Sequence, residues 1–285
     1  MSGLVRAEWM RLSRRGDLWI VVLAVVALNV VGYIGGLSST QNVQFGPPGE
    51  PIPPEILEQW EAQAREQLAQ YAFPNSIRIG LEGGRVLVFA IVAYLAAAFT
   101  GADFDYGTIR TSLVARGDRR GFVLVRLAAT FVAAVVLIAI VVLLSAILPL
   151  IAAALGTDFP PVEGPSPVAF AGMLGSALAT AAFLIGLTTL LTLLFRNAAV
   201  AIVLTVVYAF ADSAIAGLIV QVAGEDAALR WALPVVNAQL LFDRAAGASL
   251  APEWPTLVAV AMAIGWVVVT WGLSVRTLAR ADIHA

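Results

Sequence analysis

The sequence contains no cysteine, no lysine and only one histidine, and each of these scarcities excludes a class of protein. Without cysteine the chain forms no disulfide and has no thiol chemistry, and the single His284 cannot supply the cluster of ligands that zinc needs. All seventeen basic residues are arginine, which excludes a Walker A loop, because that loop needs a lysine to reach the phosphates of ATP. We therefore expect no metal, no cofactor and no catalytic site on this chain, and any ATP hydrolysis to occur on another chain.

Charge is scarce as well, at 13% of 285 residues, whereas 60% of the residues are hydrophobic. A water-soluble core of this size could not hide so much apolar surface, so lipid must surround most of the chain. The formal net charge of −2 provides no basic field to hold nucleic acid, which we exclude as a partner.

Six stretches of the sequence are long and apolar enough to cross a bilayer core, which takes roughly 20 residues of helix. They are residues 18–37, 86–102, 122–155, 168–195, 198–222 and 256–275. The third is longer than one perpendicular crossing, so we expect a tilted helix or one interrupted near Pro149. The sequence thus predicts an all-α membrane protein in which residues 1–285 form a single transmembrane domain with six transmembrane helices.

The positions of the arginines predict the orientation, because short cytoplasmic segments retain positive charge. With the N-terminus inside, twelve of the seventeen arginines are cytoplasmic. These are Arg6, Arg11, Arg14, Arg15, Arg110, Arg116, Arg119, Arg120, Arg126, Arg196, Arg276 and Arg280. We therefore predict a multi-pass protein of the bacterial inner membrane with both termini in the cytoplasm.

This orientation leaves two large external segments. Residues 38–85 form a loop with a predicted helix that begins at Pro54, ends at Phe73-Pro74 and carries one apolar face. Residues 223–255 include semi-apolar pieces too short to span the membrane, which favours re-entrant or interfacial helices before the last span. In the spans, the pairs Gly32–Gly36 and Gly172–Ser176 have the spacing that lets helices approach closely. We expect them to pack within one subunit, and the alternative is that they form the seam of a dimer.

The N-terminal residues 1–17 have the pattern of a basic amphipathic helix, with Val5, Trp9 and Leu12 on one face. Such a helix lies in the cytoplasmic interface of a membrane. Two interpretations stay open: the segment only orients the first span, or it also contacts a cytoplasmic partner.

The cytoplasmic segment 103–121 contains residues that typically cap and end helices. Gly107 ends the preceding helix, Thr108 is placed to cap a new helix over residues 109–115, Gly117 ends that helix, and Asp118 caps the next one. The pattern predicts a short helix that lies across the cytoplasmic face between the second and third spans.

At these residues the sequence resembles the ABC-2 type permeases, the membrane subunits of many bacterial ABC exporters. Their pattern has an acidic residue, Gly-Thr, an apolar helix, a break and then basic residues, although the family more often has Glu at the acidic position and Lys where this chain has Arg126. The resemblance implies a coupling helix that binds a separate cytoplasmic ATPase, which holds ATP and magnesium, and a second permease subunit. The coupling residues that it implies are Asp103, Asp105, Gly107, Thr108, Ile109, Arg110, Leu113, Arg116, Arg119 and Arg120. The alternative is an ordinary loop whose arginines only set the topology.

Asp212 is the one acid deep within a predicted span, about 14 residues or roughly 21 Å from its cytoplasmic start. An acid at such a depth is costly and therefore a functional candidate, and Tyr208 lies one turn away on the same face. We predict that Asp212 and Tyr208 line the translocation path or an external gate. The alternative is that Asp212 lies in the external headgroup zone or caps a short helix there.

Taken together, these features predict a transporter permease that exports an amphipathic or hydrophobic substrate, such as a drug, peptide, lipid or polymer. Three other functions make different demands on the sequence. An ion-coupled carrier would need more intramembrane charge and broken-helix repeats, a membrane enzyme would need clustered catalytic side chains, and a membrane scaffold or sensor makes no such demand.

Overall fold

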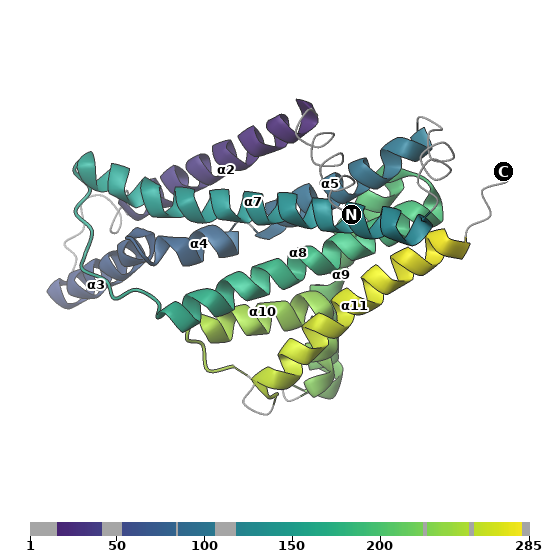
Figure 1. Ribbon diagram of the computed structural model, residues 1–285. Helices are drawn as coiled ribbons and strands as arrows, with labels where there is room; N and C mark the ends of the chain where they lie inside the picture. Colours follow the sequence, from purple (N-terminus) through teal and green to yellow (C-terminus); the bar gives the residue numbers. More distant parts are fainter. Residues whose placement is uncertain are drawn as a thin grey trace.

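The computed structural model describes residues 16–41, 53–83, 85–105, 118–224, 227–250 and 254–280, and this part of the chain is all-α. It contains nine α-helices and one short 3-10 helix, with no strand in the described ranges (Figure 1). Residues 1–15 of the predicted amphipathic helix and residues 106–117 of the predicted coupling segment lie outside the described residues.

Five helices are long and apolar enough to cross a membrane: α2 (Gly16–Gln41), α7 (Arg119–Ala154), α8 (Pro167–Phe195), α9 (Ala198–Ala223) and α11 (Thr256–Arg280). They confirm five of the six predicted spans, and the chain is a multi-pass membrane protein by helix length and hydropathy. The remaining predicted span lies on α5 (Arg85–Asp105), whose apolar part among the described residues, Phe89–Ala102, is shorter than a full crossing. The sixth crossing therefore stays a prediction.

Local sequence sets the helix ends. Asp118 accepts a hydrogen bond from the backbone N–H of Arg120 at 3.0 Å and so caps α7, as predicted. Between α8 and α9 the chain turns in two residues: Arg196 takes a left-handed conformation with φ 52°, and Asn197 caps α9 through the N–H of Val200 at 3.1 Å. These two residues end one helix and begin the next, so the two helices are closely connected.

The third predicted span is one unbroken helix. α7 has 36 residues and continues past Pro149 to Ala154, so of the two predicted alternatives the interruption near Pro149 does not occur, and the tilt stays a prediction. At 1.5 Å per residue the helix is about 54 Å long, which is well beyond a bilayer core of about 30 Å.

α8 lies at the centre of the bundle and packs against α5, α7, α9, α11 and α10 (Pro234–Ala245). α11 approaches it closely at Gly186, where an added Cβ atom would stand 2.8 Å from the Cβ of Thr270. Trp271 donates a hydrogen bond to the carbonyl of Ala182 at 2.9 Å, and Ser274 donates one to the carbonyl of Gly186 at 3.1 Å. Small and hydroxyl side chains therefore form the seam between these two helices.

The two ends of the bundle differ in which helix ends meet there (Figure 1). One side of the bundle contains the last turns of α5, α8 and α11 and the first turns of α7 and α9. We call it the arginine end after its arginines. These are Arg119, Arg120, Arg196, Arg276 and Arg280. The opposite end is called the α3 end, after α3 (Pro54–Tyr71), which begins at the predicted Pro54.

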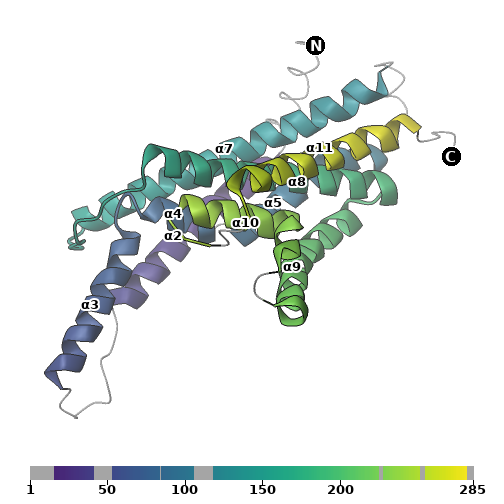
Figure 2. The ribbon, with the colours of Figure 1, turned by 90° about the horizontal axis from the view of Figure 1, so that it is seen from below.

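The helix α3 lies at the margin of the molecule and has no buried residue. Its last turn contacts α2, where the Tyr33 hydroxyl donates to the carbonyl of Tyr71 at 3.0 Å and Gly36 leaves room for the Tyr71 ring. Figure 2 shows α3 and the adjoining end of α2 extending away from the other helices. Of the predicted pair, Gly36 thus packs within the chain, whereas a Cβ atom on Gly32 would meet open space among the described residues.

The sequence did not predict α4 (Ser76–Gly83), which follows α3 and packs inside the bundle. Ser76 is 2% exposed and its hydroxyl donates to the carbonyl of Ser145 on α7 at 2.6 Å. A Cβ atom on Gly80 would overlap the side chain of Ser145, so only glycine allows this close approach. The segment that hydropathy assigned to an external loop therefore contains a helix locked against α7.

A second short helix, α10, packs within the bundle beside α8, after the 3-10 helix η1 (Ala228–Ala232). Its Asn237 is fully buried and donates to the carbonyl of Ala259 at 2.7 Å, and Trp266 donates to the carbonyl of Ala232 at 2.9 Å. Trp266 lies about 15 Å along α11 from Thr256, so the junction of η1 and α10 lies well inside the bundle. The re-entrant or interfacial placement of this segment in the membrane stays a prediction.

Candidate functional site

The described part of the predicted coupling region consists of the two helix ends that flank it. Gly107, Thr108, Ile109, Arg110, Leu113 and Arg116 lie outside the described residues. Asp103 and Asp105 form the last turn of α5, where only the backbone is described. Arg119 and Arg120 form the first turn of α7 and are exposed. Both flanking helix ends therefore lie at the arginine end of the bundle.

A buried arginine joins these two helix ends. Arg126, on α7, is 4% exposed, and its Nη1 donates to the carbonyl of Phe99 on α5 at 2.6 Å, with the carbonyl of Thr100 at 3.5 Å. Its guanidinium also lies 4.2 Å from the ring centre of Phe122. A hydrogen bond from a charged donor is among the stronger ones in proteins. The two helices that flank the segment 106–117 are thus in direct contact through Arg126.

The sequence showed Arg126 only as a basic residue after the coupling pattern. Its position within the apolar run, four residues after Phe122, was the available signal that it is buried. The carbonyls that it contacts come from another helix, 26 and 27 residues earlier in the chain, and could not be identified from spacing.

The second site is formed by Asp212, which is 1% exposed. One of its carboxylate oxygens accepts hydrogen bonds from the backbone N–H groups of Val235 at 2.9 Å and Val236 at 3.0 Å, and the other accepts one from the Tyr208 hydroxyl at 3.0 Å. The first N–H groups of a helix have no partner within it, and a negative charge there is favoured by the helix dipole. Leu233, the residue before α10, provides no side-chain cap, so Asp212 supplies the cap from α9.

The structure thus brings together Asp212 and Tyr208, as their spacing predicted, and adds the N-terminus of α10. The cap itself agrees with the predicted alternative, in which Asp212 caps a short helix in the external headgroup zone, and the depth of this cap in the membrane stays a prediction. The role of both residues in a translocation path or gate stays a prediction. The two backbone donors could not be found from the sequence, because they lie 23 and 24 residues further along the chain.

An apolar groove lies beside this site, between α5, α9 and α10. Its volume is about 220 Å³, and its lining includes Phe89, Val206, Phe210 and Val235, with Ser213 and Gln239 as the polar members. Ser213 follows Asp212 directly, so the groove and the capped helix start share one turn of α9.

Comparison with protein families gives a match over most of the chain. The profile of DUF2705, described as a family of proteins of unknown function, matches residues 64–284. The chain belongs to the DUF2705 family. None of the curated proteins compared with the chain matches it.

The region shared with DUF2705 begins within α3 and includes α4, α5 and every later helix. Both sites therefore belong to the DUF2705 region, whereas α2 precedes it. Within the residues that the structure describes, no three His, Asp or Glu side chains gather as metal ligands.

Proposed function

We propose that this DUF2705 protein is the permease subunit of an ATP-driven exporter of the ABC-2 type. In this proposal the arginine end faces the cytoplasm, and six helices, including α5, cross the inner membrane. A separate ABC ATPase binds the segment between α5 and α7 and supplies ATP and magnesium, and a second permease subunit completes the assembly. The chain itself has no enzymatic role.

The observation that supports the proposal most is the contact of Arg126 with the carbonyls of Phe99 and Thr100. A coupling segment can transmit force only if its two ends do not separate when it is pushed. Because the contact joins α5 to α7 at the base of the segment, we expect a force on residues 106–117 to displace both helices together.

The first turn of α7 supports the same interpretation. Asp118 fixes the start of the helix, and Arg119 and Arg120 are exposed directly after it. Exposed arginines of this kind steer an oppositely charged partner and set its register. They are the described residues best placed to meet an ATPase at this end.

The apolar groove beside Asp212 supports an amphipathic or hydrophobic cargo. Its volume of about 220 Å³ would accommodate only part of a drug-sized molecule, since such ligands occupy pockets of roughly 300–1,000 Å³. If the capped start of α10 moves away from α9, the groove between these helices widens and admits more of the molecule.

The direct test is whether an ABC ATPase from the same organism co-purifies with this chain. We expect the wild-type chain to retain the ATPase and the double variant Arg119→Glu/Arg120→Glu to retain it at least about tenfold more weakly, because charge reversal adds repulsion to the lost attraction. Transport-linked ATP hydrolysis in proteoliposomes should fall with the binding.

The matched control is Arg276→Glu/Arg280→Glu. It makes the same change of charge at the arginine end, also on exposed residues, but on α11. It should retain the ATPase to within about twofold. If no ATPase is retained by the wild-type chain, or if both double variants lose it equally, the proposal is wrong.

A further inference from the structure

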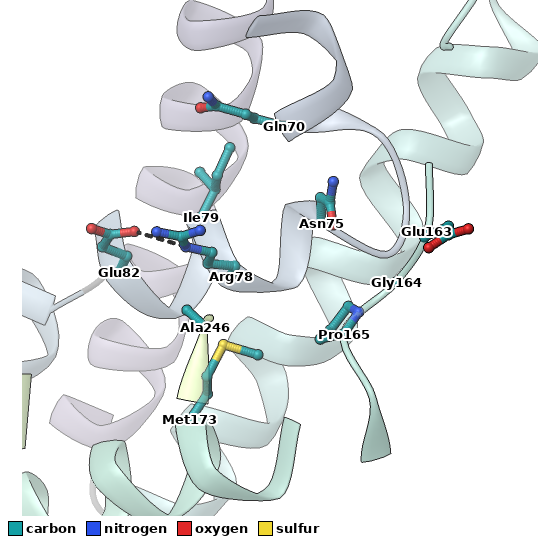
Figure 3. Close-up of a pocket in the computed structure, with 10 residues that line it drawn as sticks. All are labelled: Gln70, Asn75, Arg78, Ile79, Glu82, Glu163, Gly164, Pro165, Met173 and Ala246. Carbon is teal, nitrogen blue, oxygen red and sulfur yellow. Dashed lines mark ion pairs between the residues drawn. The ribbon is translucent and has the colours of Figure 1, made fainter. Parts of the chain in front are cut away.

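A larger cavity opens at the α3 end of the bundle, distant from the arginine end. Its volume is about 470 Å³, and it is enclosed by the end of α3, by α4, by the segment before α8 and by the end of α10 (Figure 3). This volume lies within the range of about 300–1,000 Å³ that is typical of ligand sites. Neither the coupling region nor the Asp212 site contributes a residue to it.

Part of the lining of this cavity is apolar. Met173 on α8 is fully buried, and Ile79, Pro165 and Ala246 contribute further apolar surface. The nearby packing is tight: Gly172 leaves room for Ala245, and Ser176 donates a hydrogen bond to the carbonyl of Ala238. These contacts hold α10 against α8 and so fix Met173 and Ala246 relative to each other.

The polar part of the lining carries more negative than positive charge. Arg78 and Glu82 form a loose ion pair of 3.7 Å on α4, with their side chains 48% and 45% exposed, and Glu163 is an exposed carboxylate from the segment before α8. Figure 3 shows the pair and Glu163 on different sides of the cavity. The three charged lining residues thus sum to one negative charge.

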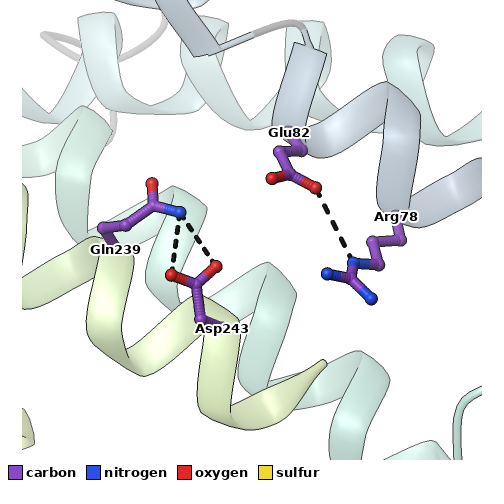
Figure 4. A network of polar contacts seen from close by, with 4 residues as sticks. All are labelled: Arg78, Glu82, Gln239 and Asp243. Atoms are coloured by element: carbon purple, nitrogen blue, oxygen red, sulfur yellow. Dashed lines mark hydrogen bonds and ion pairs between the residues drawn. The ribbon is translucent and has the colours of Figure 1, made fainter. Parts of the chain in front are cut away.

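A further carboxylate lies close to this surface. Asp243 on α10 is held by Gln239, whose amide donates to both carboxylate oxygens at 2.8 and 3.0 Å. Figure 4 shows this pair on the side of α10 toward Arg78 and Glu82. The acids attract a cation, and the single guanidinium offers a site for an anionic group on the same molecule.

We propose that this cavity binds the ammonium-bearing head of an amphipathic molecule. Glu163 holds the ammonium group, Glu82 stays paired with Arg78 across the cavity, and the apolar surface around Met173 and Ile79 contacts the first part of the tail. Arg78 contacts a phosphate where the molecule has one. The source is either a zwitterionic phospholipid headgroup or a free amphipathic amine, and both present the same ammonium chemistry.

The inference goes beyond the proposed function, because it concerns binding by this chain alone, at a site separate from the ATPase surface. It can be tested on the purified chain in maltoside micelles by native mass spectrometry. The probes are lauroyl lysophosphatidylethanolamine, lauroyl lysophosphatidylglycerol and dodecylamine. The two lysophospholipids share their acyl chain and phosphate, and only the first carries an amine.

We expect the ethanolamine lipid to bind at least about tenfold more tightly than the glycerol lipid, because a charge-assisted contact to Glu163 is available only to the amine. The variant Glu163→Gln should weaken binding of the ethanolamine lipid by about tenfold. Glu66→Gln makes the same change on the exposed surface of α3, outside the cavity, and should leave the affinity unchanged.

The two amine-bearing probes, dodecylamine and the ethanolamine lipid, distinguish a free amphipathic amine from a phospholipid headgroup as the natural ligand. Equal binding of dodecylamine and the ethanolamine lipid supports a site for free amphipathic amines, whereas tighter binding of the lipid that is lost in Arg78→Gln supports a phospholipid headgroup. Equal binding of both lysophospholipids, or equal effects of Glu163→Gln and Glu66→Gln, would overturn the proposal. None of these measurements requires an ATPase, so their failure leaves the permease proposal standing.

Discussion

α8 and α9 follow each other in the chain and have nearly the same mean hydropathy, yet their surroundings differ. In the most apolar stretch of α8, 61% of the residues are buried within the described structure, against 17% in α9. α8 also buries more hydroxyl side chains, which are Ser176, Thr180, Thr188, Thr189 and Thr192. Apolarity marks both helices as membrane-embedded, while small and hydroxyl residues mark the one at the centre.

The buried residues of α9 form a single narrow stripe: Ala201, Thr205, Asp212 and Ala216. The spacing of three to four residues or its multiples places them on one face of the helix. Large apolar side chains such as Val203, Val207 and Phe210 are exposed within the described chain. We therefore expect α9 to depend on a few contacts and α8 to depend on close packing along its length.

The largest effect is expected from Asp212→Ala. The substitution leaves the buried N–H groups of Val235 and Val236 without their acceptor, and we expect the free energy of unfolding to fall by about 3 kcal/mol. The measurement is unfolding in mixed SDS and dodecyl maltoside micelles. Ser213→Ala, on the next and exposed residue, should change stability by less than about 0.5 kcal/mol. Equal effects would show that α9 has no special contact at Asp212.

A smaller effect is expected from adding volume to α8. A side chain at Gly186 meets Thr270 and Trp271 of α11, so Gly186→Val should cost about 2 kcal/mol through overpacking. Gly217 on α9 has open space around it, and Gly217→Val should have an effect near zero. The same assay measures both. A cost at Gly217 as large as at Gly186 would contradict the distinction between a central and a peripheral helix.

The smallest effect concerns the contact between the two helices. The hydroxyls of Thr188 and Thr205 lie 3.0 Å apart, and both residues are buried. In a double-mutant cycle of Thr188→Val and Thr205→Val, we expect a coupling energy of about 0.6 kcal/mol, as is typical of hydrogen bonds between membrane helices. Strictly additive effects of the two substitutions would show that the hydroxyls do not stabilise each other.

Much of this fold could be predicted because the helices that enter lipid are long and uniformly apolar. The boundaries set by local chemistry also followed from sequence, as with the Asp118 cap and the turn at Arg196 and Asn197. α4 was missed because it is short and only partly apolar, and what buries it is the glycine contact with Ser145 on a different helix.

The candidate sites were predictable where their partners are near in sequence. Tyr208 and Asp212 lie four residues apart, and their contact followed from helix periodicity. The other features depend on segments that are far apart in the chain and that only tertiary packing brings together. They are the capped start of α10, the carbonyls that Arg126 contacts and the cavity at Glu163. The coupling helix between the second and third spans stays a prediction, since residues 106–117 lie outside the described residues.

The unbroken helix α7 has a mechanical consequence. It contacts α5 through Arg126 at one end and α4 through Ser145 at the other, and these two residues are about 28 Å apart along the helix axis. Gly80 leaves no free space at Ser145, so α4 cannot slide past it. An axial displacement of α7 at the arginine end must therefore carry α4 with it, and move Arg78 and Glu82 on the far side of the molecule.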